Sequence, residues 1–254
     1  MKKITVIALA VLLASCATTT HKKDVAHKTD CVFLASGERT EPPGDADELL
    51  ACSVRINKHK TGTSSGTIVN AKVIQEPGKK DKTHFWVLST GHMHDRIDPE
   101  IEIFFLHKTK LDKPIIVKGA IRFLVENGIN GGTDFSLIEA NVDAVGVSFV
   151  PLAPENYIVK DGEKLLSCGC DWGREPKCYP TALRKYKVGG DLETDTATGV
   201  GRSGGGLFTN ERDRKYVVGV CWGGTGETPQ TWFTTHKTVH KMLNISGLTE
   251  EIKK

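Results

Sequence analysis

The sequence predicts an all-β protein made of two six-stranded antiparallel barrels and a C-terminal helix. The first observation is a series of short β-prone runs, separated by turn residues, that continues through most of the chain. The second is the glycine content, 26 of 254 residues, with many of these glycines late in the chain, as tight turns between strands require. The third is that only residues 236–245 have helical spacing, with Val239, Met242 and Leu243 on one side.

The predicted strands fall into two sets of similar size. Their intervals and their alternation of apolar and polar residues are typical of an antiparallel barrel or sandwich. The first set comprises residues 53–56, 66–69, 85–89, 101–106, 115–120 and 135–139, and the second comprises residues 164–168, 181–188, 205–209, 216–222 and 231–234. Between them, Pro151 and Pro154 mark residues 150–155 as a crossover between two halves.

These runs predict the organisation of the chain. We expect a folded domain over residues 31–246, with a first barrel at about 50–150, a second at about 155–235 and the helix at 236–245. Residues 247–254 are predicted to be a short tail with no room for an accessory domain.

Composition excludes several classes of protein. A content of 39% hydrophobic and 26% charged residues is typical of a globular chain and excludes a disordered or fibrous one. The formal net charge of +3 is too small for the basic surface that nucleic-acid binding requires, so we expect no nucleic-acid partner.

Residues 1–15 have the pattern of a secretory signal. Lys2 and Lys3 precede an apolar run at 4–14, which spans about 16 Å as a helix and is therefore too short to cross a membrane. The run ends in the letters LASC, which resemble a bacterial lipobox and imply lipid attachment to Cys16. The alternative is a plain cleaved signal in which Cys16 is incidental.

The lipobox resemblance implies a location. We expect a chain anchored in the bacterial cell envelope through Cys16, with residues 16–30 as a flexible polar tether. Ala17 after the cysteine is typical of outer-membrane sorting, which would place the domain in the periplasm.

Six further cysteines remain, and an even number in an exported chain predicts disulfides. Among fifteen possible pairings we predict Cys31 with Cys52 and Cys170 with Cys178, with Cys168 and Cys221 either paired or free. A zinc site at Cys168, Cys170 and Cys178 is disfavoured, because the spacing is not C-x2-C and no fourth ligand is near. We expect neither a metal nor a cofactor.

Three short motifs carry chemically useful side chains. His92 ends the hydrophobic run VLSTGH, Asp134 begins the apolar run in TDFSLI, and Ser203 lies in the glycine-rich turn GVGRSGGGLF. Together, in the order His, Asp, Ser, they resemble the trypsin/chymotrypsin-like serine endopeptidases over about residues 50–246. GTIV at 66–69, VVGVCWG at 217–223 and TPQTWF at 228–233 are similar to other segments of that family.

The resemblance implies hydrolysis of a peptide or protein substrate through an acyl-enzyme. Ser203 would be the nucleophile, His92 the general base, and Asp134 the group that orients the imidazole. The backbone N–H groups of Gly201 and Ser203 would form the oxyanion hole.

The resemblance also implies which residues contact substrate. Cys221, Trp222 and Gly223 belong to the substrate-lining strand, and Gln230 to the opposite wall of the pocket. Ala197 stands where trypsin-like members carry an acid at the pocket floor. We therefore expect an uncharged residue, and not Lys or Arg, before the scissile bond.

The chain departs from the family pattern at several positions. Arg202 replaces the acid often found before the serine, so a freed N-terminus cannot pair with that acid to activate the enzyme. Cys221 replaces a serine whose hydroxyl supports the aspartate, and Gly206 replaces a proline.

Three other interpretations fit parts of the sequence. The letters GRSGG at 201–205 satisfy the elbow of α/β-hydrolases, with Asp213 and His236 following, but that elbow requires a helix after the serine. His92 and His94 could begin a metal site, although no third ligand has suggestive spacing. A catalytically silent member of the same fold, acting as an envelope binding or scaffold protein, is the main alternative.

Overall fold

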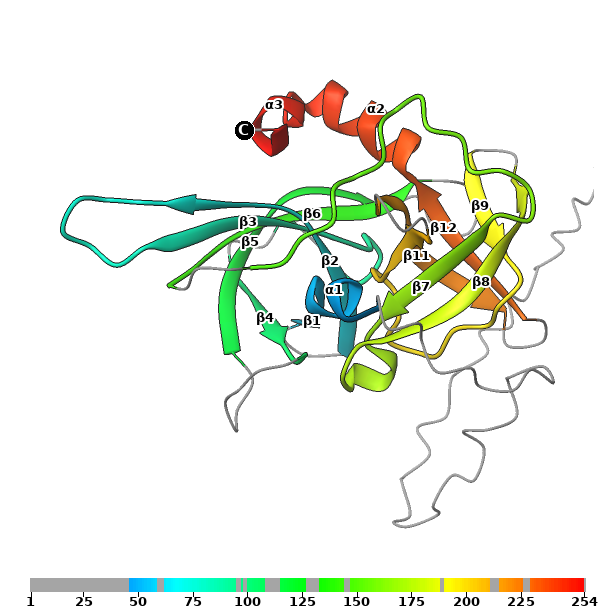
Figure 1. Cartoon of the computed structure of the whole chain (residues 1–254), viewed down its shortest axis with the longest axis horizontal. Helices are drawn as coiled ribbons and strands as arrows, with labels where there is room; N and C mark the ends of the chain where they lie inside the picture. The colour runs from blue at the N-terminus through cyan, green and yellow to red at the C-terminus, as the bar shows by residue number, and fades with distance from the viewer. Residues whose placement is uncertain are drawn as a thin grey trace, which may run out of the picture. The chain divides into compact units, whose positions relative to one another are not determined.

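The predicted pair of barrels is confirmed by the computed structural model (Figure 1). It describes residues 46–58, 62–94, 97, 100–107, 115–126, 133–143, 147–187, 190–210, 215–225 and 229–253. The signal, the tether, Cys16, Cys31 and Asp213 lie outside these residues.

The first barrel closes in the order β1-β2-β3-β6-β5-β4, and every pair of neighbours is antiparallel. The pairing of β1 with β4, which sets Ile56 opposite Ile103, closes it. Its strands are β1 (Ser53–Lys58), β2 (Gly62–Ile74), β3 (Lys82–Ser89), β4 (Ile101–Phe105), β5 (Ile115–Glu126) and β6 (Asp134–Val142).

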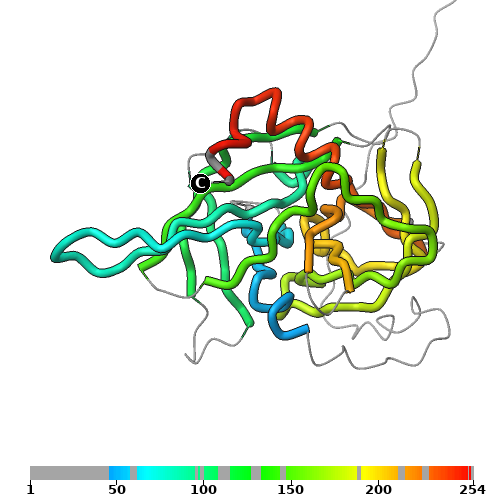
Figure 2. The backbone as a smooth tube through the Cα atoms, turned by 45° about the horizontal axis from the view of Figure 1, so that its top comes forward, coloured from blue at the N-terminus to red at the C-terminus, as the bar shows by residue number. Residues whose placement is uncertain are grey.

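β2 and β3 are longer than the sequence predicts. Their far ends form a hairpin that projects away from the barrel, with residues 72–80 exposed (Figures 1 and 2).

The second barrel closes in the order β10-β11-β12-β9-β8-β7. Its strands are β7 (Lys164–Gly169), β8 (Lys177–Tyr186), β9 (Asp191–Thr194), β10 (Gly206–Thr209), β11 (Val217–Thr225) and β12 (Gln230–Thr235). The sequence predicts five of these six. It misses β9 because the four residues DLET, although all buried, have three polar members and no apolar alternation.

The C-terminal helix α2 (His236–Ser246) agrees with the prediction. The side chain of Thr235 accepts a hydrogen bond from the backbone N–H of Thr238 and so caps its first turn, and Gly247 ends it at φ 76°. Within the predicted tail, Thr249–Lys253 form a further short helix, α3, that the sequence pattern does not predict. The short helices α1 (Ala46–Ala51) and η1 (Asp171–Gly173) were also not predicted. No helix of the described residues is long and apolar enough to cross a membrane.

The core explains why the two barrels stay together. One apolar cluster fills the first barrel with residues such as Val54 and Leu137 and continues to Val217 and Val220 of the second. A smaller cluster fills the second barrel, including Leu192 and Phe233.

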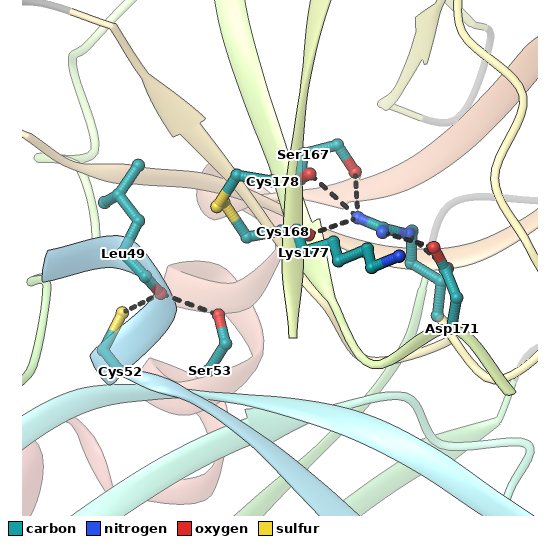
Figure 3. Close-up of a disulfide and its surroundings, with 9 residues drawn as sticks. Leu49, Cys52, Ser53, Ser167, Cys168, Asp171, Lys177 and Cys178 are labelled. Atoms are coloured by element: carbon teal, nitrogen blue, oxygen red, sulfur yellow. Dashed lines mark hydrogen bonds and ion pairs between the residues drawn. A yellow bond between two sulfur atoms is a disulfide. The ribbon is translucent and has the colours of Figure 1, made fainter. Parts of the chain in front are cut away.

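The disulfide joins Cys168 to Cys178, which corrects the predicted pair Cys170–Cys178 (Figure 3). Cys168 and Cys178 stand directly opposite each other on β7 and β8, whereas Cys170 lies just past the end of β7. Side chains two residues apart in an extended chain point to the same face. The spacing alone therefore could not tell whether Cys168 or Cys170 pairs with Cys178. The bond also removes two of the three thiols of the zinc interpretation.

The other described cysteines are buried free thiols: Cys52, Cys170 and Cys221. Burial raises the pKa of Cys170 and of Cys221 to about 12, which keeps both protonated at neutral pH. Cys52, predicted to pair with Cys31, donates from Sγ to the carbonyl of Leu49 at 3.2 Å, while Cys31 lies outside the described residues.

Candidate active site

His92 and Asp134 meet at the end of the first barrel. His92 follows β3, Asp134 begins β6, and these strands are neighbours in the sheet. The imidazole Nδ1 lies 2.6 Å from the carboxylate Oδ2, so Asp134 faces one ring nitrogen. Nε2 of His92 has no hydrogen bond within the described part of the chain and remains open to a second partner.

The carboxylate of Asp134 is buried among donors. Its Oδ1 accepts from the backbone N–H of Gly91 at 2.5 Å, the backbone N–H of His92 at 2.9 Å and the hydroxyl of Thr90 at 3.0 Å. Burial alone would raise the pKa of Asp134, but the hydrogen bonds and charge of His92 outweigh it and hold the pKa below its ordinary value. Asp134 is therefore ionised at neutral pH and holds the ring in one orientation.

Thr90 and Thr234 support this pair and were missed by the sequence analysis. The Thr90 hydroxyl lies 2.8 Å from Nδ1 of His92 as well as near Asp134. Thr234, on β12 of the other barrel, accepts from the Asp134 N–H and donates to its C=O, both at 3.1 Å. Thr90 could have been found from its place in the VLSTGH motif, but nothing local marks Thr234.

Ser203 is carried to the same region by the second barrel. Its carbonyl accepts from the N–H of Ser65 on β2 at 2.7 Å, and the carbonyl of Ser65 accepts from the Ser89 hydroxyl at 2.7 Å. Ser89 is the last residue of β3, three positions before His92. Two hydrogen bonds thus connect the serine turn to the strand that presents the imidazole.

The third contact of a triad is not formed. Within the described residues, Ser203 makes no side-chain hydrogen bond to His92. The structure therefore brings His92 and Asp134 into contact and sets Ser203 nearby without joining its hydroxyl to the ring.

The turn around Ser203 depends on glycine. Gly204 has φ +89°, and a Cβ there would lie 2.0 Å from the carbonyl oxygen of Ser65, so only glycine allows this approach of the two barrels. Gly201 has φ +90°, where a side chain would be strained. The N–H groups of Gly201 and Ser203 donate no hydrogen bond within the described part of the chain.

The predicted substrate-lining segments also come together. Thr198, next to Ala197, hydrogen-bonds the Cys221 side chain, and its hydroxyl lies 3.4 Å from that of Thr231 on β12. Trp222 stacks on Trp232, with ring centroids 5.1 Å apart.

The contacts of two further residues define this region. Gln230 pairs with Thr225 at the start of β12, one residue before the buried Thr231, so Thr231 and not Gln230 contacts the Ala197 segment. Asp195, the acid closest in sequence, accepts from Thr181 and the N–H of Ala182 and so faces β8.

The competing interpretations find no support in this geometry. Ser203 is followed by the strand β10 and not by a helix, which excludes the α/β-hydrolase elbow. His236 is buried elsewhere, with its ring nitrogens 3.2 Å from the carbonyls of Val218 and Tyr157. Among the described residues, no three His, Cys, Asp or Glu side chains gather as a metal site would require.

Two closed six-stranded barrels, with these residues between them, define the class: a protein with the trypsin-like fold of serine endoproteases. No family model and no curated protein matches the sequence. Solved structures with this fold include the serine endoprotease from Yersinia pestis, with 14% identity and a TM-score of 0.60 over 81% of this chain and 67% of that chain.

Two further solved structures share the fold. The inactive form of a serine-to-alanine mutant of Rv3671c from M. tuberculosis H37Rv has 14% identity and a TM-score of 0.57 over 83% of this chain and 96% of that chain. The MamO protease domain from Magnetospirillum magneticum has 15% identity and a TM-score of 0.55 over 77% of this chain and 97% of that chain. At such identities the likeness establishes the fold, while the chemistry depends on this chain's own residues.

Proposed function

We propose that the protein is a serine endopeptidase that uses Ser203, His92 and Asp134. The observation that carries the proposal is the 2.6 Å contact between His92 Nδ1 and Asp134 Oδ2, beside the Ser203 turn and with Nε2 left open. A carboxylate on one ring nitrogen fixes the tautomer in which the other nitrogen can accept a proton.

The proposed reaction has two halves. Ser203 Oγ attacks the peptide carbonyl while its proton passes to His92 Nε2, and Asp134 stabilises the imidazolium. The oxygen of the tetrahedral intermediate accepts from the N–H groups of Gly201 and Ser203, which have no other partner in the described residues. His92 then protonates the leaving amine, and water attacks the acyl-enzyme in the same way.

Covalent labelling tests the proposal. A fluorophosphonate probe should react with the folded, disulfide-intact protein at Ser203, and Ser203→Ala should abolish the label. Ser246→Ala, at the end of α2, is the matched control and should label like the wild type, because its hydroxyl bonds the carbonyl of Leu243. A folded wild-type protein that takes no label would contradict the proposal.

We also propose that the residue before the scissile bond is uncharged. The segment around Ala197 contacts Thr231 and Cys221, while Asp195 bonds to β8, so no carboxylate of this segment is left to pair with a substrate lysine or arginine. A peptide-library cleavage profile should show little cutting after Lys or Arg. A dominant preference for either would overturn this specificity.

The location of the protein is proposed from the sequence alone. Cys16 would carry the lipid that anchors the domain to the cell envelope, facing the periplasm. Cells fed radiolabelled palmitate should incorporate label into this protein, and Cys16→Ser should lose the label and leave the membrane fraction. Unchanged labelling in Cys16→Ser would exclude this anchor.

A non-catalytic binding role in the same fold is the second candidate. The observation that favours it is the lack of a hydrogen bond between Ser203 and His92 in the described residues. Such bonds often form only when substrate is present, so the labelling experiment separates the two functions. Binding of peptides without labelling or cleavage would favour the second.

A further inference from the structure

Arg202 is the largest side chain that the described part of the chain buries completely. It stands between Gly201 and Ser203, the two residues whose amides would bind the oxyanion. Its Nε and Nη2 each lie 2.7 Å from one oxygen of Asp171, in a bidentate pair. Nη1 donates to the carbonyls of Ser167 at 2.8 Å and Lys177 at 3.2 Å. Figure 3 labels these two residues and Asp171.

A buried ion pair is weak evidence for a stabilising role, because apolar residues of similar volume often stabilise a fold as well or better. The position of this pair therefore needs another explanation. The carboxyl of Asp171 lies directly against the turn, since a Cβ on Gly199 would come within 3.1 Å of it. Asp171 is 31 residues before Arg202 and begins η1, so the pair joins η1 to the serine turn.

From η1 the connection continues to the first oxyanion amide. Trp172, next to Asp171, has φ 56° and is the one described non-glycine residue with a positive φ. In this conformation its N–H donates to the carbonyl of Val200 at 2.6 Å. The Val200–Gly201 peptide is trans, so its N–H points opposite to its C=O, away from Trp172.

A second contact holds the other side of Gly201. The Ser65 hydroxyl donates to the carbonyl of Gly201 at 2.8 Å and accepts from the N–H of Cys170 at 2.7 Å. Both peptides that flank Gly201 are therefore held, one by Trp172 and one by Ser65, and its N–H is left without a partner in the described residues.

We infer that Arg202 and Asp171 are positioning residues, which hold the Gly201 amide in its donor orientation through Trp172 and make the oxyanion hole independent of a new N-terminus. The inference rests on the proposed function. A left-handed Trp172 is unfavourable by itself and persists only where its surroundings enforce it. Without the ion pair, Trp172 would relax and the Val200–Gly201 peptide would be free to turn its N–H away.

The same arrangement predicts that a freed α-ammonium group has no role. In some of the trypsin-like endopeptidases that the sequence resembles, such a group pairs with an acid at the position of Arg202. Here a cation occupies that position, its carboxylate partner is supplied from within the domain, and an incoming ammonium group would be repelled.

The test compares three variants of the full chain on a chromogenic peptide thioester with an uncharged residue before the scissile bond. Asp171→Asn should lower kcat by about a hundredfold or more and change KM by less than about threefold, because the oxyanion contact forms only in the transition state. Arg202→Lys keeps the positive charge but cannot form the bidentate ion pair, so its kcat should lie between those of the wild type and Asp171→Asn. Glu139→Gln, which removes a carboxylate paired with His84 and Arg122 on the first barrel, is the control and should keep the wild-type kcat.

A spectroscopic readout separates positioning from general damage. The low-field proton NMR signal of the His92–Asp134 hydrogen bond should be unchanged in Asp171→Asn, because that bond is formed entirely by the first barrel. Wild-type kcat in Asp171→Asn, or loss of the His92 signal together with kcat, would overturn the inference. Should Asp171→Asn fail to fold, wild-type kcat in Arg202→Lys would overturn it and an intermediate kcat would support it.

Two further outcomes complete the test. An uncleaved N-terminal fusion should have the same kcat as the chain without it, and a large rise in kcat on removal of the fusion would overturn the inference. If the wild-type protein neither hydrolyses the thioester nor reacts with fluorophosphonate, the proposed function fails and the inference with it. That outcome is distinct from an active wild type with an equally active Asp171→Asn.

Discussion

The two barrels present their candidate catalytic groups in different ways. The first presents His92 and Asp134 from the ends of two neighbouring strands, and the contact between them follows from the register of β3 with β6. The second presents Ser203 and two amides from a turn between strands, held by a buried ion pair, a hydroxyl and glycines. The end of a strand is positioned by the hydrogen bonds between that strand and its neighbours, whereas a turn needs additional contacts to keep one conformation.

The barrels also differ in what stabilises them. The core cluster that fills the first is apolar, while the second has a smaller apolar cluster together with the disulfide Cys168–Cys178 and the Arg202–Asp171 pair. Substitutions that leave the apolar cores intact should therefore differ in effect. Those at the strand ends that carry His92 and Asp134 should abolish chemistry with little change in stability, and those near the serine turn should affect both.

The largest expected effect is on chemistry in the first barrel. Asp134→Asn should lower kcat on the order of ten thousandfold, because an amide no longer holds His92 in the tautomer that accepts a proton at Nε2. Steady-state kinetics check this, with Glu139→Gln on the same strand as the control. An Asp134→Asn protein with more than about a tenth of the wild-type kcat would contradict the role given to the carboxylate.

The next effect is on the stability of the second barrel. Asp171→Ala should lower the free energy of unfolding by about 3–5 kcal/mol, because it leaves the fully buried guanidinium of Arg202 without its anion. Urea denaturation followed by circular dichroism measures it. Glu139→Ala, whose side chain is 30% exposed, should cost about 1 kcal/mol or less. Equal losses of unfolding free energy in Asp171→Ala and Glu139→Ala would contradict the difference in stabilisation between the two barrels.

The disulfide should contribute less to the free energy of unfolding than the Arg202–Asp171 ion pair. Its cysteines are 10 residues apart, and closing a loop of that size in the unfolded chain is worth about 2–3 kcal/mol. The double variant Cys168→Ala with Cys178→Ala should lose about that much stability. Dithiothreitol should destabilise the wild type by a similar amount and leave the double variant unaffected. A dithiothreitol effect that persists in the double variant would indicate another disulfide.

The smallest effect is a pH dependence from His236. Burial lowers the pKa of His236 below its ordinary 6.5. The unfolded chain therefore takes up a proton below pH 6.5 that the folded chain does not, so this contribution is complete above pH 6.5 and is lost as the pH falls below it, by at most about 1.4 kcal/mol per pH unit.

Denaturation curves between pH 7.5 and 5 check this dependence. His236→Gln should flatten the slope of the unfolding free energy with pH in that interval. The same slope in both proteins would show that the ring is not held neutral in the fold. The pKa of Asp134 is held below its ordinary value of 3.8, so its contribution to the unfolding free energy is constant in this interval and does not affect the slope.

Much of the fold and part of the site could be predicted from the sequence. The alternation of apolar and polar residues depends only on the two faces of a single strand, so it can be read from a short stretch of sequence. For this reason eleven of the strands, and likewise the helix α2, could each be predicted separately. His92, Asp134 and Ser203 were recognisable for the same reason, because each lies in a short motif at the edge of a strand or in a turn.

Only the tertiary structure decided the remaining contacts, because each joins residues far apart in the chain. Thr234 reaches Asp134 across 100 positions, and Ser65 reaches Gly201 across 136. Such contacts depend on how two closed barrels pack together, and no local pattern of side chains records that. The amino-acid sequence by itself therefore determined which residues stand at strand ends and turns. The register of β7 with β8 determined that Cys168 pairs with Cys178, and the folding of the second barrel determined that Asp171 pairs with Arg202. The packing of the two barrels determined which groups surround the serine.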